Sequence, residues 1–303
     1  MALPTPHLDK LNALLDNDKL PINDKERIGH AIEKYHEWIQ AMIDTEGEQS
    51  TIINCLVSSL SEYKQFIDLN TIFDSESDFL YRQKGQLKLD NTVIEEFLPH
   101  LISKSLPELD EEMYLGPQSC FSAAYFTSTI TRREYGGGLH IRTKAQDFTI
   151  ARKLYIQTSH DPDFNTQVIE RETYLGYICA ECKTNLDKTM FQEASATAHD
   201  VKTAVPGAKY YLLCEWLDMT PISTTPTDID EVLLLRKAKR IGSQVRRHYA
   251  TYQGRQQVRE EYARHLSENP FSPEVFARFV SHIAGVLTDT DPDEGSVLNG
   301  GYF

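Results

Sequence analysis

The middle of the chain constrains the fold most, because strand-like and helix-like segments alternate there. Three runs are rich in β-forming side chains: residues 147–159, 173–184 and 208–219. Between the last two lies an Ala-rich stretch, 190–205, which Pro206 and Gly207 close and which predicts a helix. A strand, a helix and a strand predict a parallel crossover, and the hairpin-like pair before them makes the sheet mixed. We therefore expect an α/β fold with a mixed central sheet flanked by helices.

Helical patterns dominate both ends of the chain. Three N-terminal segments carry helical apolar stripes: residues 25–43, residues 52–66 and the stretch that follows Asp90-Asn91. After the aromatic, small-residue stretch 113–130, the Gly136–Gly138 triplet predicts a turn or mobile loop. Near the C-terminus we expect a strand at 231–237, a basic helical segment at 238–266 and an amphipathic helix at 272–287. The acidic, Gly-rich final stretch is expected to be loosely held.

Charge distribution points to the second part of the chain as the place where an anion would bind. The net charge is -14, but residues 1–115 hold 22 Asp and Glu against 10 Lys and Arg, whereas the remainder holds 23 against 21. No apolar run approaches the roughly 20 residues of a membrane span, and the N-terminus lacks a basic-then-apolar export signal. We therefore expect a soluble, cytoplasmic protein without a membrane partner.

The five cysteines do not suggest a disulfide framework or a zinc site. Their number is odd and their spacing is scattered, which is typical of a reducing compartment. Cys179 and Cys182 form one C-x-x-C pair, but a zinc ribbon needs a second pair. The sequence also lacks the Gly-rich motifs that bind nucleotides and the H-E-x-x-H motif of zinc proteases.

The most informative motif, Glu181-Cys182-Lys183, ends the second strand-like run. Because side chains alternate along a strand, Glu181 and Lys183 lie on the same face. Two charged groups at the end of a run as apolar as residues 174–180 must be paired or hold a metal. Taken alone, the motif could be a surface ion pair, so its context decides.

An acidic residue supplies that context, because Asp147 opens the strand-like run before the motif. The order acid, strand, connection, strand, E-x-K, helix, strand resembles the layout of the PD-(D/E)xK nuclease core. Two carboxylates can hold Mg²⁺ through hard oxygen ligands, and the metal lowers the pKa of a bound water. A lysine beside them orients or helps to deprotonate that water and offsets charge in the transition state. The main-chain carbonyl of Cys182 can supply a further oxygen ligand.

A second aspartate competes for the role of first acid. Asp163 stands in a literal Pro162-Asp163 sequence, 18 residues before Glu181. Residues 160–163 are typical of a loop, whereas Asp147 begins a run that can pair with 173–184. We therefore prefer Asp147 and keep Asp163 as the alternative.

Basic residues gather in two groups that could follow a phosphate backbone. The first has nine members, with tyrosines 249, 252 and 262 interleaved: Arg236, Lys237, Lys239, Arg240, Arg246, Arg247, Arg255, Arg259 and Arg264. The second comprises Arg132, Arg133, Arg142, Lys144, Arg152 and Lys153. The alternative for the first group is a set of solvated helix faces with ion pairs between neighbouring turns.

The segment 181–219, together with residues 146–150, resembles the type II restriction endonucleases grouped with BbvCI, DdeI and the Bpu-ten-I enzyme. The likeness covers roughly residues 120–240, and no proline precedes Asp147 as the name of the superfamily would require. It implies that Asp147 and Glu181 are metal ligands and that Lys183 is the catalytic base or charge stabiliser. It also implies Mg²⁺-dependent hydrolysis of double-stranded DNA at a specific site, as part of a restriction-modification system.

The resemblance also implies an organisation and partners. We expect a helical region for dimerisation or DNA recognition at 1–114, the nuclease core at 115–245, and a C-terminal helical segment and tail at 246–303. Some members of this group work as two different subunits, so a homodimer or a heterodimer with a related subunit is expected. The alternatives are a repair or junction-resolving nuclease with the same core, and a catalytically inactive DNA-binding protein.

Overall fold

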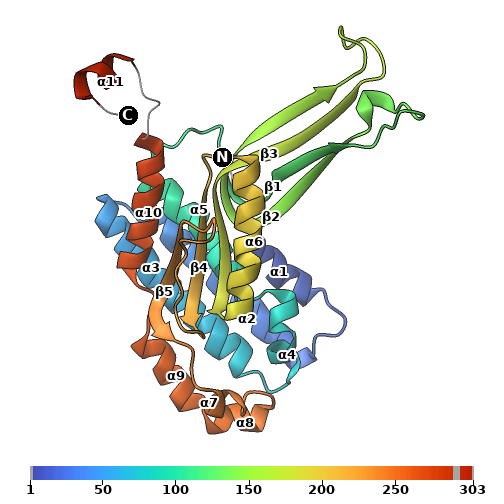
Figure 1. Cartoon of the computed structure of the whole chain (residues 1–303). Coiled ribbons are helices and arrows are strands. Elements are labelled where there is room, and N and C mark those ends of the chain that lie inside the picture. The colour runs from blue at the N-terminus through green and yellow to red at the C-terminus, as the bar shows by residue number, and fades with distance from the viewer. Residues whose placement is uncertain (1–2, 289–293, 302–303) are drawn as a thin grey trace.

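A five-stranded mixed sheet forms the centre of the computed structural model, which describes residues 3–288 and 294–301 (Figure 1). Its strands lie in chain order: β1 (Tyr114–Phe126), β2 (Leu139–Thr158), β3 (Ile169–Leu186), β4 (Lys209–Leu217) and β5 (Glu231–Lys239). The pairs β1–β2 and β2–β3 are antiparallel, whereas β3–β4 and β4–β5 are parallel. The predicted mixed sheet is confirmed.

The predicted crossover helix is α6 (Lys188–Ala204), which connects β3 to β4 and covers one face of the sheet (Figure 1). The Asp187 side chain begins the helix by accepting a hydrogen bond from the amide of Met190 at 2.9 Å. Small side chains on the inner face, Ala194 and Ala198, are completely buried and let the helix lie close to the strands. This packing leaves the C-terminal ends of β3 and β4 at the same edge of the sheet.

The N-terminal helices and one C-terminal helix cover the opposite face of the sheet. They are α1 (Pro6–Leu15), α2 (Ile22–Asp44), α3 (Gln49–Gln65), α4 (Phe79–Leu87), α5 (Thr92–Ser105) and α10 (Pro273–Thr288), and the π-helix η1 (Phe66–Phe73) directly continues α3. One hydrophobic cluster runs from α1–α5 through sheet residues such as Phe148 and Leu213 to Phe279 of α10. The helices expected at 25–43, 52–66, after Asp90-Asn91 and at 272–287 are therefore present.

The stretch 113–130, to which the sequence assigns no element, forms most of β1. Gly116 adopts a φ of 134°, and the register with β2 shifts between Gly116 and Gln118 and again between Phe121 and Ala123. These irregularities interrupt the alternation that identifies a strand in a sequence. The strand is nevertheless paired with β2 over its whole length.

Strand β2 bends so that the two hairpins it belongs to end side by side. The Gly136–Gly138 triplet forms a turn with positive φ, which includes the 3₁₀-helix η2 (Tyr135–Gly137). Gly136 donates its amide to the carbonyl of Gln167 at 2.8 Å and accepts a bond from the Thr158 hydroxyl at 2.9 Å. The hairpin ends, residues 123–141 and 153–173, project from the body and are called the arm below (Figure 1).

The expected basic helix at 238–266 is wrong as a single element. Residues 238–239 complete β5, and the remainder forms three short helices: α7 (Ser243–Arg246), α8 (Tyr252–Gln257) and α9 (Arg259–Glu268). Thr251 caps α8 by accepting the amide of Gly254 at 3.2 Å. A Cβ atom at Gly254 would lie 2.1 Å from the carbonyl oxygen of His248, so this tight turn requires glycine.

The tail of the chain falls partly outside the described residues. Residues 289–293 and 302–303 belong to the stretch predicted to be loosely held, and the structure does not describe them. Residues Glu294–Gly300 form the short helix α11. No helix in the described part of the chain is long and apolar enough to cross a membrane.

Candidate active site

The site begins where β2 and β3 separate. Their ladder ends at the pair Phe148–Ala180, after which β2 pairs only with β1 and β3 only with β4. Beyond this pair, the Asp147 side chain replaces the main-chain hydrogen bonds between the two strands, because its Oδ2 accepts the amide of Cys182 at 3.0 Å. Asp147 therefore lies directly beside the E-x-K motif, with a side chain that is 17% exposed.

Glu181 and Lys183 form an ion pair at this divergence. Their Oε1 and Nζ atoms lie 2.6 Å apart, and the Tyr210 hydroxyl of β4 donates to Glu181 Oε2 at 3.0 Å. Burial penalises the lysine charge, but the bond to Glu181 and the charges of Glu181 and Asp147 outweigh this penalty and raise the pKa of Lys183. Lys183 is therefore an ammonium ion at neutral pH.

Residues of α5 and of the turn before it complete the site. No sequence pattern associated them with it. Lys88 Nζ lies 3.3 Å from Asp147 Oδ1 and 3.8 Å from Glu95 Oε1. Asn91 donates to the carbonyl of Cys182 at 3.3 Å and accepts from the Thr184 hydroxyl at 2.7 Å. The start of α5 is thus fastened to the end of β3, across about ninety residues of sequence.

Glu95 is the least satisfied carboxylate of this group. It is buried, and its Oε1 has no hydrogen-bond partner among the described residues. Burial, followed by the charge of Asp147, raises the pKa of Glu95 above its ordinary value. An acid in the first turn of a helix is ordinarily explained by the helix dipole, so the sequence offered no separate signal for it.

The donor atoms suit a hard divalent cation. Asp147, Glu181 and the Cys182 carbonyl offer oxygen ligands, which Mg²⁺ and Ca²⁺ prefer, and the unpartnered oxygen of Glu95 faces the same region as Lys88. No group of three or more His, Cys, Asp or Glu that could hold a metal occurs within residues 3–288 and 294–301. The predicted set is smaller than such a group, because one of its three ligands is a main-chain carbonyl.

The structure separates the two candidates for the first acid. Asp163 is exposed in the turn between β2 and β3 at the end of the arm, where its amide donates to Asp161 at 3.1 Å. Asp147, in contrast, contacts the E-x-K motif directly.

The cysteines of the C-x-x-C pair belong to hydrophobic clusters on opposite faces of the sheet, because three residues along a strand reverse the direction of the side chain.

Three of the nine basic residues predicted to follow DNA have structural roles instead. Arg255 is completely buried, and Arg236 is buried against Glu215 and stacked on Phe271. Arg259 forms two 2.7 Å bonds with Asp74. The six that remain at or near the surface are Lys237, Lys239, Arg240, Arg246, Arg247 and Arg264.

The second basic group lies on β2 and on the turn that precedes it, and most of its members are paired with acids. Arg142 and Lys144 both contact Asp200 of α6, at 3.5 and 2.9 Å. Arg132, Arg152 and Lys153 pair with Glu134, Asp110 and Glu172. This group therefore offers less uncompensated positive charge than the first.

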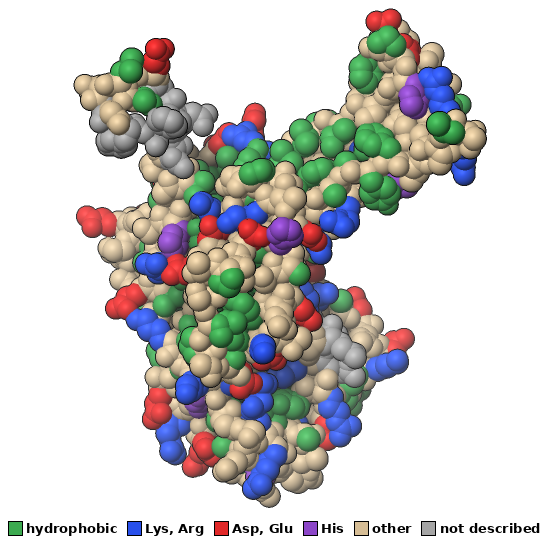
Figure 2. All heavy atoms as spheres, viewed as in Figure 1, with side chains coloured by type: hydrophobic (Ala, Val, Ile, Leu, Met, Phe, Trp, Pro, Cys, Tyr) green, Lys and Arg blue, Asp and Glu red, His purple; other side chains and the backbone are tan. Residues whose placement is uncertain are grey.

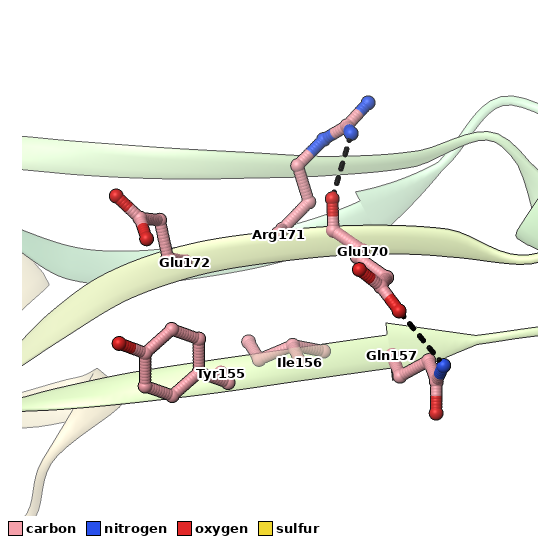
Figure 3. Close-up of a pocket in the computed structure, with 6 residues that line it drawn as sticks. All are labelled: Tyr155, Ile156, Gln157, Glu170, Arg171 and Glu172. Carbon is pink, nitrogen blue, oxygen red and sulfur yellow. Dashed lines mark hydrogen bonds between the residues drawn. The ribbon is translucent and has the colours of Figure 1, made fainter.

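One pocket lies on the arm, remote from these carboxylates. It is a shallow hollow of about 580 Å³ on the arm, lined by Tyr155, Ile156, Gln157, Glu170, Arg171 and Glu172 (Figure 3). A 3.0 Å bond from Gln157 to Glu170 crosses between its two strands. It contains no lysine, nucleophile or convergent acid pair, so we do not assign chemistry to it.

Comparison with known proteins establishes the class. A solved structure described as the native BbvCI A2B2 tetramer at low resolution is similar in fold, with a TM-score of 0.56 and 18% sequence identity over 88% of this chain and 98% of that chain. No curated protein matches the sequence. The model of the Bpu10I restriction endonuclease family matches residues 86–303, and the chain belongs to this family. It is therefore a nuclease of the restriction endonuclease class, a class that cleaves DNA.

Proposed function

We propose that this chain is a type II restriction endonuclease that uses Mg²⁺ to hydrolyse phosphodiester bonds of double-stranded DNA at a specific site. The observation that carries the proposal is the convergence of Asp147, Glu181 and Lys183 where β2 leaves β3. Family membership supports DNA as the substrate. Type II specificity, the metal and the residue roles are our inferences.

Asp147, Glu181 and the Cys182 carbonyl would hold the metal. When bound, Mg²⁺ supplies Lewis-acid polarisation of the phosphoryl oxygen and acidifies a water molecule. Tyr210 orients Glu181, and the amide of Cys182 orients Asp147. Asn91 fixes the Cys182 peptide while leaving its carbonyl a second lone pair.

Lys183 would act as a cation rather than as a base. In the free protein the bond to Glu181 and the nearby carboxylate charges outweigh burial, raise the pKa of Lys183 and keep it protonated. It can still donate hydrogen bonds to a water or a phosphate oxygen and offset the negative charge that develops in the transition state. Its bond to Glu181 holds the ammonium beside the carboxylates before DNA binds.

A plasmid digest tests the function directly. Incubation with Mg²⁺ should give discrete fragments, whereas smears or branch-specific cuts would indicate a repair or junction-resolving nuclease, and no cutting a DNA-binding protein. Asp147→Ala and Glu181→Ala should abolish cutting but retain DNA binding in Ca²⁺, because these residues hold the metal. Asp163→Ala is the matched control and should cut normally. A variant at Asp147 with wild-type activity would refute our choice of first acid.

The surface-exposed members of the first basic group are proposed to contact the DNA backbone. Neutralising Arg246 and Arg247 together should weaken binding on every DNA sequence alike, and each lost phosphate contact should reduce the salt slope by about 0.9. Site preference should remain, since phosphate contacts position the protein without reading bases. If the affinity and its salt dependence are unchanged, the DNA-binding surface would instead be the group around Arg132–Lys153.

Assembly with a second copy or a related subunit remains a proposal, and the arm supports it. Six of the ten large hydrophobic side chains that are exposed among the described residues lie there: Tyr125, Phe126, Ile130, Tyr135, Tyr155 and Phe164. Exposed apolar side chains gathered in one place are typical of protein interfaces. Sedimentation of the wild type and an Ile130→Asp, Tyr155→Asp variant tests the proposal, and equal masses for the two proteins would exclude the arm as the interface.

A further inference from the structure

A small pocket opens at the C-terminal ends of β3 and β4, beside the proposed site but apart from its carboxylates. It is called the strand-end pocket and is lined by Tyr81, Lys84, Thr184, Asn185, Trp216, Arg240, Ile241, Arg246, Tyr249, Tyr262 and His265. These residues come from α4, the two strand ends and the segment that contains α7–α9. In Figure 2, Lys and Arg side chains gather in the lower part of the molecule, where Figure 1 places α4, α7 and α8.

Positive charge dominates the mouth of this pocket. Arg240 and Arg246 share a single acid, Asp218, whose Oδ2 lies 2.7 Å from Arg240 Nη1 and 3.8 Å from Arg246 Nη2. Arg246 also donates to the carbonyl of Ile241 at 3.0 Å, which fixes the direction of its side chain. Each guanidinium has five N–H donors, and these contacts use a minority of them. Lys84, 3.7 Å from Asp90, supplies a third cation.

Two neutral polar groups in the pocket wall have no partner. Tyr249 is 5% exposed, and its hydroxyl makes no hydrogen bond within the described residues. The Nε2 atom of His265 also has no hydrogen-bond partner there. An unmade hydrogen bond of a buried group is destabilising, so its persistence needs an explanation. A ligand oxygen that enters the pocket would relieve this cost.

The size of the pocket selects the kind of ligand. Its volume is about 60 Å³, room for a few water molecules at the roughly 10–15 Å³ that one water needs. A phosphate group fits this space, whereas a purine or pyrimidine base does not. Cations, neutral donors and small volume together favour a tetrahedral oxyanion.

The position of the pocket identifies the source of that anion. Thr184 and Asn185 directly follow Lys183, and two residues of a strand advance the chain by roughly 6.6 Å. Each DNA strand has one phosphate per roughly 3.4 Å of helix axis, so the phosphates one and two positions from the cleaved one lie within about this distance along the axis. We propose that the strand-end pocket binds a backbone phosphate next to the one that is cleaved, with Arg240, Arg246 and Lys84 as the cations.

This inference rests on the proposed function and assigns Arg246 a task that its neighbour Arg247 does not share. Arg247 is exposed and does not line the pocket, and its side chain donates only to the His248 ring among its described contacts. The pair therefore offers a matched comparison of one charge inside the pocket and one outside it. Arg246→Gln should weaken DNA binding in Ca²⁺ and reduce the salt slope by about 0.9, and this loss should depend on the charge of one phosphate next to the cut, whereas any loss caused by Arg247→Gln should not depend on that phosphate.

A substitution in the DNA separates phosphate binding from a structural effect of Arg246. Once the plasmid digest has located the cut, single phosphates around it are replaced by uncharged methylphosphonates. Replacement at one position next to the cut should weaken wild-type binding roughly tenfold or more. The same replacement should have little further effect on Arg246→Gln, because the two changes remove one contact. Tyr249→Phe, which keeps the ring but removes the unpartnered hydroxyl, should weaken binding to the same DNA several-fold without lowering thermal stability.

The outcomes are distinct. If the wild type neither cuts nor binds DNA, the proposed function fails, and this inference fails with it. If the wild type cuts but the Arg246 and methylphosphonate effects simply add at every position, the strand-end pocket does not bind a DNA phosphate. If inorganic phosphate raises the thermal stability of the wild type but not of Arg246→Gln while the methylphosphonates have no effect, the pocket binds a free anion and the proposal is overturned.

Discussion

At the scale of single residues, the site is a set of charges that neutralise one another before substrate arrives. Lys183 neutralises Glu181, and Lys88 lies between Asp147 and Glu95. Half-buried carboxylates repel one another and resist ionisation unless a cation is near. The lysines therefore offset the negative charge of these carboxylates in the free protein.

Removal of the Lys183 ammonium should slow cleavage far more than it weakens binding. We expect Lys183→Ala to reduce the single-turnover rate by roughly 10²–10³-fold, the loss typical of a group that stabilises transition-state charge. Affinity for DNA in Ca²⁺ should change little. Lys188→Ala, which removes an exposed lysine at the start of α6, is the control and should retain the wild-type rate. A rate within a few-fold of wild type for Lys183→Ala would remove Lys183 from the mechanism.

A second residue gives the stability of the protein a specific pH dependence. Glu96 is fully buried, and burial raises its pKa to about 7, although Tyr35 and the amides of His7 and Leu8 donate hydrogen bonds to it. The folded state binds this proton more tightly than the unfolded state, whose pKa is 4.5. The stabilisation is therefore fully present below pH 4.5 and is lost as the pH rises towards 7.

Glu96→Gln should remove this loss, because an amide does not titrate. Urea unfolding measured from pH 5 to 8 should show that wild-type stability declines relative to the variant, by on the order of 3 kcal/mol over the whole range. Parallel curves for the two proteins would mean that Glu96 ionises normally in the folded state.

The sequence predicted some site residues because their signal is local. Glu181 and Lys183 lie two residues apart in one strand, and Asp147 opens the preceding strand. Lys88, Asn91 and Glu95 reach the same place from a helix that is distant in the chain, and no local pattern records such a contact. The nine basic residues failed as a group for the same reason, since burial of Arg236 and Arg255 depends on partners far away.

At the scale of elements, β3 depends on a glycine at its centre. A Cβ atom at Gly176 would lie 2.6 Å from Cys179 Sγ, 2.9 Å from Cys120 Sγ and 3.2 Å from Thr149 Oγ1. Both cysteines are completely buried, so neither sulfur can move away without disturbing the packing. The close approach of β1, β2 and β3 at this level needs a residue without a side chain.

Gly176→Ala should therefore destabilise the fold by about 1–3 kcal/mol through overpacking. Gly207 provides the control, because no atom lies within 4 Å of the Cβ position there, and Gly207→Ala should be close to neutral. Thermal and urea unfolding of both variants measure the difference. Equal stability of the two variants would show that the three strands can move apart at no cost.

Elements with a regular pattern were predictable and those with interruptions were not. Helix α6 and strand β4 fall within a few residues of their predicted bounds, since one is an Ala-rich stretch closed by Pro206 and Gly207 and the other an apolar run. Strand β1 escaped prediction because two register shifts break its alternation. The basic segment was predicted as one helix because a single glycine gives little signal in the sequence. In the structure, the tight turn that leads into α8 requires Gly254.

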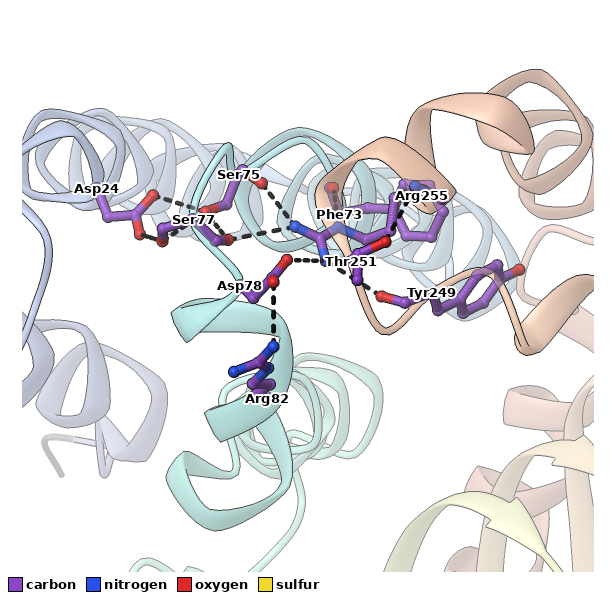
Figure 4. A network of polar contacts seen from close by, with 10 residues as sticks. Asp24, Phe73, Ser75, Ser77, Asp78, Arg82, Tyr249, Thr251 and Arg255 are labelled. Atoms are coloured by element: carbon purple, nitrogen blue, oxygen red, sulfur yellow. Dashed lines mark hydrogen bonds and ion pairs between the residues drawn. The ribbon is translucent and has the colours of Figure 1, made fainter.

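At the scale of the whole molecule, one arginine connects the N-terminal helical region to the C-terminal segment that contains α7–α9. Arg255 of α8 donates to the carbonyls of Phe73, Ser75, Ser77 and Tyr249 and pairs with Asp78 at 3.0 Å (Figure 4). Asp24 holds the same loop from α2 through the hydroxyls of Ser75 and Ser77. The N-terminal helices and α7–α9, which bound the strand-end pocket on two sides, are thus fixed relative to each other.

Loss of the Arg255 guanidinium should destabilise the whole protein. Arg255→Met leaves several buried carbonyls and Asp78 without a donor, and we expect a loss of about 3 kcal/mol or more in the free energy of unfolding. Arg264→Met, at an exposed position of α9, should stay within about 0.5 kcal/mol of wild type. A stable Arg255→Met protein would indicate that water replaces the guanidinium.

The arm has a consequence for how chains of this family can diverge. Its turns lie at the far ends of two hairpins, whereas Asp147 and Glu181 lie at their base. A hairpin that gains or loses residues in matched pairs at its tip keeps the same side chains on the same faces at its base. The length of the arm and the partner that it contacts can therefore change in evolution while the side chains at its base keep their positions. Two related chains can then share the same candidate site and assemble with different partners.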